Sequence, residues 1–148
     1  MRLPRNALVI VADGEKYLAL RQHGEGLKID LTVEDSHAEP APAHTAEMGT
    51  DRPGRYARPA SSARETVEET DLKRLAKEDF AAGLADRLNC DARDGAFDAL
   101  VLVADARSLG LLRGKLDAAV QSRLLREIEG DYTRHTVADI AGLLGRTE

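Results

Sequence analysis

Tryptophan is absent from this 148-residue sequence, and aromatic residues make up only 3% of it. The hydrophobic core must therefore consist mainly of aliphatic side chains. The sequence has one cysteine, Cys90, which excludes an intramolecular disulfide and a cysteine metal cluster within one chain. Because Cys90 lies near the end of a helical pattern, we expect a partly buried structural thiol. No apolar run approaches the ~20 residues of a membrane span, and no signal peptide is present. These features favour a cytoplasmic protein without a membrane partner.

Several motifs of known chemistry are also missing. We find no glycine-rich phosphate-binding motif and no serine–histidine–aspartate pattern, so the sequence predicts no cofactor. The histidines are scattered along the sequence, so we expect solvated side chains and no metal ligands among them. They are His23, His37, His44 and His135. The formal net charge of −5 argues against nucleic-acid binding by the whole surface.

Two continuous apolar runs, Ala7–Ala12 and Ala99–Ala104, predict strands that are covered on both faces. Asp13-Gly14 is a hairpin signal that leads into a second strand at Lys16–Gln22. Polar and apolar residues alternate over Leu27–Glu34, which predicts a strand with one buried face at a sheet edge, where its charges disfavour pairing with another copy.

The second half of the sequence alternates helices and strands. A long helix is predicted from Asp71 to about Cys90, starting near Thr66 or Thr70. Its apolar positions share one face: Leu72, Leu75, Ala76, Phe80, Leu84 and Leu88. The remaining expected elements are a helix at Ser108–Leu116, a strand at Leu124–Glu129 and a last helix capped by Thr136 and extending through Leu144.

This order predicts one three-layer α/β domain over residues 1–148, with a mixed five-stranded sheet flanked by helices. The sheet order 3-2-1-4-5 follows if the crossovers are right-handed and sequential strands are neighbours. Ribonuclease-H-like domains have the same order.

A long irregular segment at about residues 36–70 interrupts this pattern. Loops of this length in small domains are usually functional or disordered. Between Arg52 and Arg64 the sequence has four arginines and no acidic residue. Arginine offers a planar fork of donors that suits phosphate. The candidate binding residues are Gly49, Thr50, Asp51, Arg52, Pro53, Gly54, Arg55, Tyr56, Arg58 and Arg64.

The sequence resembles the bacterial host attachment protein family over nearly its whole length. The segments that carry the resemblance are Val11–Gly14, Gly49–Arg55, Phe97–Ala104, Leu109–Arg113 and Glu127–Thr133. The resemblance implies a relation to the middle domain of eukaryotic and archaeal peptide-chain release factors and to pelota, and an indirect role in attachment to host cells. Release factors carry a Gly-Gly-Gln tip that this sequence lacks, so peptidyl-tRNA hydrolysis by that mechanism is not expected.

Two functions are compatible with these residues. The first is a non-enzymatic binding protein whose arginine loop contacts the ribosome or transfer RNA, with Tyr56 placed between arginines to stack on a base. The alternative is a magnesium-dependent, ribonuclease-H-like phosphodiesterase that uses Asp13 and Asp105, which end two predicted parallel strands. Both aspartates also suit structural roles, in a hairpin turn and at a helix N-cap. The sequence favours the binding protein.

Overall fold

The computed structural model describes residues 1–38 and 62–147, with the backbone alone at 38 and at 62–70. The strands are β1 (Leu8–Ala12), β2 (Lys16–Gln22), β3 (Leu31–Ala38), β4 (Leu100–Ala104) and β5 (Leu124–Glu129). The helices in the described residues are α2 (Ser62–Arg93), α3 (Ala106–Arg113), α4 (Ala118–Gln121) and α5 (Val137–Arg146).

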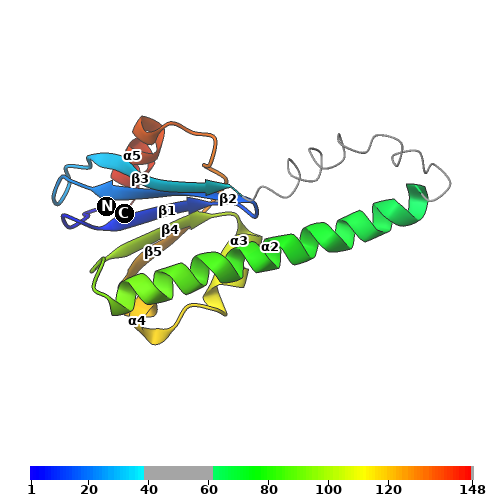
Figure 1. The fold of residues 1–148 in the computed structure, drawn as a ribbon. Coiled ribbons are helices and arrows are strands. Elements are labelled where there is room, and N and C mark those ends of the chain that lie inside the picture. The colour runs from blue at the N-terminus through cyan, green and yellow to red at the C-terminus, as the bar shows by residue number, and fades with distance from the viewer. Residues whose placement is uncertain (39–61, 148) are drawn as a thin grey trace.

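The five strands form one mixed sheet in the order β3-β2-β1-β4-β5, as the sequence predicted. β1 pairs parallel with β4 and β4 with β5, whereas β2 is antiparallel to both of its neighbours. Helices α2, α3 and α4 lie on one face of the sheet and α5 on the other (Figure 1). The three-layer α/β domain is thereby confirmed.

The apolar strands β1 and β4 are buried on both faces because their side chains alternate between two cores. Leu8, Ile10 and Ala12 of β1 pack in the core beneath α2 and α3. Val9 and Val11 pack in the second core, beneath α5. The corresponding residues of β4 divide in the same way, which explains why both strands are continuous apolar runs.

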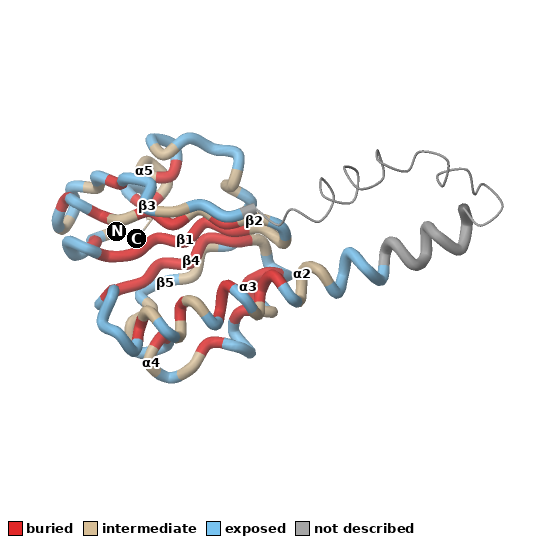
Figure 2. Tube along the Cα trace, viewed as in Figure 1, coloured by how far each residue is buried: buried red, intermediate tan, exposed pale blue. Residues whose placement is uncertain are grey.

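Helix α2 is longer than the sequence predicted. It starts at Ser62, upstream of the expected start, and its first part extends past the edge of the sheet (Figure 1). The expected apolar face is only partly correct, since Leu72 and Leu75 are 62% and 49% exposed. From Phe80 onward the helix packs against the sheet and most of its apolar side chains are buried (Figure 2). The apolar positions recur at the helical period along α2, but the sheet covers only the later part of the helix.

The edge strand also differs from the prediction. β3 starts at Leu31 and runs to Ala38, so residues 27–30 precede it and residues 36–38 belong to it. Of the alternating positions, Leu31 is buried whereas Val33 is 50% exposed. Residues 36–38 and 62–70, expected in the irregular segment at 36–70, therefore belong to β3 and α2, and residues 39–61 lie outside the described residues.

Local signals in the sequence were more reliable. The hairpin between β1 and β2 forms, with the backbone N–H of Asp13 donating to the carbonyl of Lys16 at 3.0 Å. Thr136 caps α5 and forms a capping box with Asp139. Cys90, expected to be partly buried, is exposed. Within residues 1–38 and 62–147, none of the helices has the length and apolarity needed to cross a lipid bilayer.

Candidate functional site

The carboxyl ends of the three parallel strands meet at one edge of the sheet, and an aspartate follows each of them. Asp13 follows β1, Asp105 follows β4, and Asp131 lies two residues after β5. Ligands of open α/β sheets generally bind outside this edge. Here it holds a cleft of about 270 Å³, whose lining includes all three aspartates together with Lys77, Arg107 and Ser108.

The two aspartates singled out by the sequence are thus brought to one cleft, but both carboxylates already have hydrogen-bond donors. Asp13 accepts from the backbone N–H groups of Glu15 at 2.6 Å and Lys16 at 2.8 Å, which shapes the hairpin turn. Asp105 caps α3 and accepts from the N–H of Ser108 at 3.2 Å and its hydroxyl at 2.7 Å. These are the turn and cap roles weighed against metal binding.

Asp131 was not predicted as a site residue. The strand before it, β5, is not a continuous apolar run, so the sequence does not mark the carboxyl end of this strand. The hydroxyl of Thr133 lies 2.8 Å from the carboxylate of Asp131 and 3.2 Å from that of Asp13. Hydrogen bonds from the hydroxyl and backbone N–H of Thr133 hold the pKa of Asp131 below its usual value. Among the described residues, no group of three or more His, Cys, Asp or Glu side chains is placed to hold a metal ion.

A second cleft, about 230 Å³ in volume, lies beside the first and is mainly basic. It is lined by Asp71, Lys73, Arg74 and Lys77 of α2 and by Arg107 of α3. Lys77 and Arg107 line both clefts. Four cations face one acid, and that acid forms a 3.5 Å ion pair with Arg74. We call Lys73, Arg74, Lys77 and Arg107 the basic cluster.

Lys77 is positioned by a close contact with the hairpin turn. A Cβ built on Gly14 would lie 2.8 Å from both Cγ and Cδ of Lys77, so the lysine chain crosses directly over the glycine. Lys73 and Lys77 belong to the long helix that the sequence predicted. Arg107 is distant in sequence, and only the packing of α3 beside α2 brings it to them.

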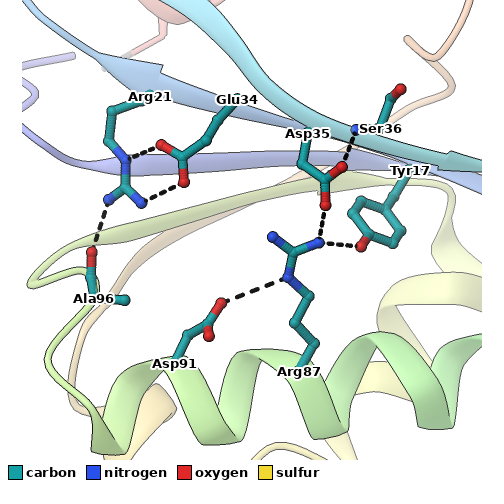
Figure 3. Close-up of polar contacts among 8 residues, drawn as sticks. All are labelled: Tyr17, Arg21, Glu34, Asp35, Ser36, Arg87, Asp91 and Ala96. Carbon is teal, nitrogen blue, oxygen red and sulfur yellow. Dashed lines mark hydrogen bonds and ion pairs between the residues drawn. The ribbon is translucent and has the colours of Figure 1, made fainter.

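A third cleft, about 240 Å³ in volume, opens between α2 and the strands β2 and β3. Tyr17 and His37, paired across these strands, line it with Phe80 and Arg87 of α2. Arg87 donates hydrogen bonds to the hydroxyl of Tyr17 and the carboxylate of Asp35 (Figure 3). This group could not be predicted from the sequence, because no local pattern shows that Tyr17 and His37 pair across two strands.

Most of the predicted arginine loop, Gly49 to Arg58, lies outside the described residues. Arg64, which the sequence analysis placed in the loop, lies within helix α2. The segment with Arg52, Arg55 and Arg58 thus leads into the projecting end of α2, the same helix that carries most of the basic cluster.

Comparison with known proteins identifies a family for this chain. No curated protein matches this chain. The sequence model described as "Bacterial archaeo-eukaryotic release factor family 12" matches residues 6–144, nearly the whole chain. This match supports the release-factor relation and a translation-related function inferred from the sequence. The chain belongs to bacterial archaeo-eukaryotic release factor family 12.

Proposed function

We propose that this protein is a non-enzymatic, translation-associated RNA-binding protein, which holds RNA phosphates against the outer part of α2. The observation that carries the proposal is the basic cluster, in which three side chains of α2 and Arg107 of α3 line one cleft. In a chain with a net charge of −5, this concentration of positive charge is local. Lysine and arginine at such a surface bind phosphate and release its counterions.

The position of the cluster suits a long polyanion better than a small anion. Its residues lie where α2 leaves the sheet, and Lys73 and Arg74 are exposed. The helix starts at Ser62, immediately after the segment that carries Arg52, Arg55 and Arg58. Phosphates along one RNA strand could therefore contact both groups of cations. The family's relation to release factors makes ribosomal or transfer RNA the natural partner.

The three aspartates of the first cleft limit how far this contact extends. Asp13, Asp105 and Asp131 repel phosphate, so the RNA backbone would follow α2 and avoid the ends of the strands. The resemblance to host attachment proteins extends the proposal with an indirect effect on attachment to host cells. That effect would be exerted through translation in the cytoplasm.

The proposal is tested by co-sedimentation of the protein with bacterial ribosomes at two salt concentrations. We expect saturable, salt-sensitive binding, which is weakened by Lys73→Ala/Arg74→Ala/Lys77→Ala and separately by Arg52→Ala/Arg55→Ala/Arg58→Ala. A matched control removes one arginine and two lysines elsewhere, as Arg2→Ala/Lys28→Ala/Lys115→Ala, all exposed residues near the amino ends of the parallel strands. Binding that survives both sets of substitutions, or that the control loses equally, would reject the proposal.

A metal-dependent phosphodiesterase is the second candidate function, and one observation favours it. Asp13 and Asp105 line the same cleft, as two magnesium ligands would. Titration with Mg²⁺ or Mn²⁺ followed by incubation with labelled RNA tests this candidate. Metal-dependent cleavage that Asp105→Asn abolishes would replace the binding proposal, and intact RNA at every metal concentration would eliminate the enzyme.

A further inference from the structure

The third cleft, between α2 and the strands β2 and β3, is lined by aromatic residues, which are scarce in this chain, and we call it the aromatic cleft. The sequence has three tyrosines and two phenylalanines, and Tyr17 and Phe80 both line this cleft. His37 provides a third ring. The volume of about 240 Å³ is below the roughly 300 Å³ of a pocket for a drug-sized ligand, so the cleft suits one ring system.

The three rings pack as one group with His37 outermost. Tyr17 and Phe80 are buried, with 8% and 6% of their surface exposed, whereas His37 is exposed. The centroid of the His37 ring lies 6.0 Å from that of Phe80 with an interplanar angle of 17°, and 5.8 Å from that of Tyr17. The buried rings therefore support the imidazole, which is an exposed aromatic platform.

Arg87, a polar group at the rim of the cleft, is fixed in place. Arg87 donates to Tyr17 and Asp35, its guanidinium carbon lies 5.6 Å from the centroid of the Tyr17 ring, and its Nε lies 3.5 Å from the carboxylate of Asp91 (Figure 3). Asp79, which is exposed, adds an acceptor to the same lining. An apolar floor with one donor and one acceptor at its rim suits a flat heterocycle that has both kinds of polar edge.

The aromatic cleft and the basic cluster are neighbours on α2. Lys77 lies three residues before Phe80, and side chains at this spacing adjoin on one side of a helix. A phosphate at Lys77 would therefore place its nucleotide next to the aromatic cleft. Bases of single-stranded RNA are commonly held by stacking on aromatic side chains, histidine included.

We propose that this cleft binds one unpaired base of the RNA whose phosphates contact the basic cluster, with His37 as the stacking platform. The inference rests on the proposed function, because it assigns the base to an RNA strand held by α2. It adds a base-binding site to a surface that otherwise contacts only phosphates.

The test compares a single-stranded RNA oligonucleotide with an abasic oligomer of the same length, both measured by fluorescence anisotropy. Two variants alter the cleft. His37→Ala removes the platform. Gly83→Leu fills the cleft from α2, where a Cβ at Gly83 would meet nothing within 4 Å. Their matched controls are His23→Ala, an exposed histidine near the amino ends of the parallel strands, and Gly83→Ala, which adds a single methyl group.

We expect the wild-type protein to prefer RNA to the abasic oligomer. Each cleft variant should lose about fivefold or more in RNA affinity, the lower end of the effect of one stacked base, and should bind the abasic oligomer unchanged. Equal wild-type affinity for the two oligomers, or cleft variants that retain the preference, would overturn the base site and leave phosphate binding intact. Failure of the wild-type protein to bind either oligomer would overturn both proposals.

Discussion

Arg87 of α2 binds the carboxylate of Asp35 on the edge strand β3, joining segments that lie 52 residues apart in the sequence. A second arginine bridge lies nearby, where Nε and Nη2 of Arg21 donate to Glu34 at 2.7 and 2.8 Å (Figure 3). Both bridges hold β3, whose outer edge has no neighbouring strand in the described sheet. Besides its antiparallel backbone pairing with β2, the edge strand is held by these polar side chains, since most of its residues are exposed.

These bridges predict a loss of stability in acid. The hydrogen bond from Arg21 lowers the pKa of Glu34, and the hydrogen bond from Arg87 lowers that of Asp35. The unfolded chain should protonate these groups near their ordinary pKa values of about 4.3 and 3.9. Below those values the unfolded state binds more protons than the folded state. The free energy of unfolding therefore decreases as the pH decreases.

Urea unfolding at pH 6, 4 and 3 measures this loss. The stabilisation is fully present above about pH 4.3 and disappears as the pH falls through the lowered folded-state values. The variant Glu34→Gln/Asp35→Asn should be less stable than wild type at pH 6 and lose less stability on acidification. Parallel pH profiles for the two proteins would show that the bridges contribute nothing.

The second stability prediction concerns Gln22, a fully buried polar residue whose amide nitrogen and oxygen are both hydrogen-bonded. Its amide nitrogen donates to the carbonyl of Lys28 at 2.9 Å, and its amide oxygen accepts from the N–H of Asp30 at 2.8 Å. Replacement by Leu leaves these backbone groups without partners, and we expect a loss of about 2–3 kcal/mol in urea unfolding. Gln121→Leu, at an exposed glutamine, is the control and should cost less than about 1 kcal/mol.

Substitution of glycine by alanine should have opposite effects on stability at Gly24 and at Gly83. A Cβ at Gly24 would lie 2.1 Å from the carbonyl oxygen of Lys28, so Gly24→Ala must displace the backbone and lower the melting temperature. At Gly83, inside α2, the added methyl meets nothing within 4 Å. Gly83→Ala should stabilise the protein by about 1 kcal/mol through helix propensity. Thermal unfolding of the two variants beside wild type checks both signs, and destabilisation by Gly83→Ala would contradict the packing described for α2.

Substitutions of Asp105 distinguish a structural role of this residue from a metal-binding role. As the N-cap of α3, it should tolerate Asn, whereas Asp105→Ala should cost about 1 kcal/mol. A metal ligand would respond differently, since bound Mg²⁺ would stabilise the wild-type protein against unfolding. Melting temperatures with and without Mg²⁺ decide between these roles. We expect no shift, and a rise in the wild type that Asp105→Asn abolishes would assign the aspartate to a metal site.

The fold was predictable where local sequence and burial agree. Leu8–Ala12 and Leu100–Ala104 are buried on both faces, so their apolar runs identified the central strands, and the cap at Thr136 identified α5. The prediction was wrong where tertiary contacts decide. Leu72 and Leu75 continue the apolar period of α2 but are exposed, because the length of the sheet is not encoded in the sequence of the helix.

The candidate site was only partly predictable for a related reason. Asp13 and Asp105 were identified because each follows an apolar strand, and they do line one cleft. The basic cluster needs Arg107 to pack beside α2, and the aromatic cleft needs the pairing of Tyr17 with His37. Such contacts join residues far apart in the sequence, and no local motif records them.

The salt dependence of RNA binding tests the central claim most directly. The slope of log Kd against log salt concentration counts phosphate contacts, at about 0.7 for each contact with a single strand. We predict that Lys73→Ala/Arg74→Ala/Lys77→Ala lowers the magnitude of this slope by about 2 and weakens binding. The control Arg2→Ala/Lys28→Ala/Lys115→Ala removes the same charge and should keep the wild-type slope. Equal slopes for all three proteins would contradict the assignment of the RNA contact to α2.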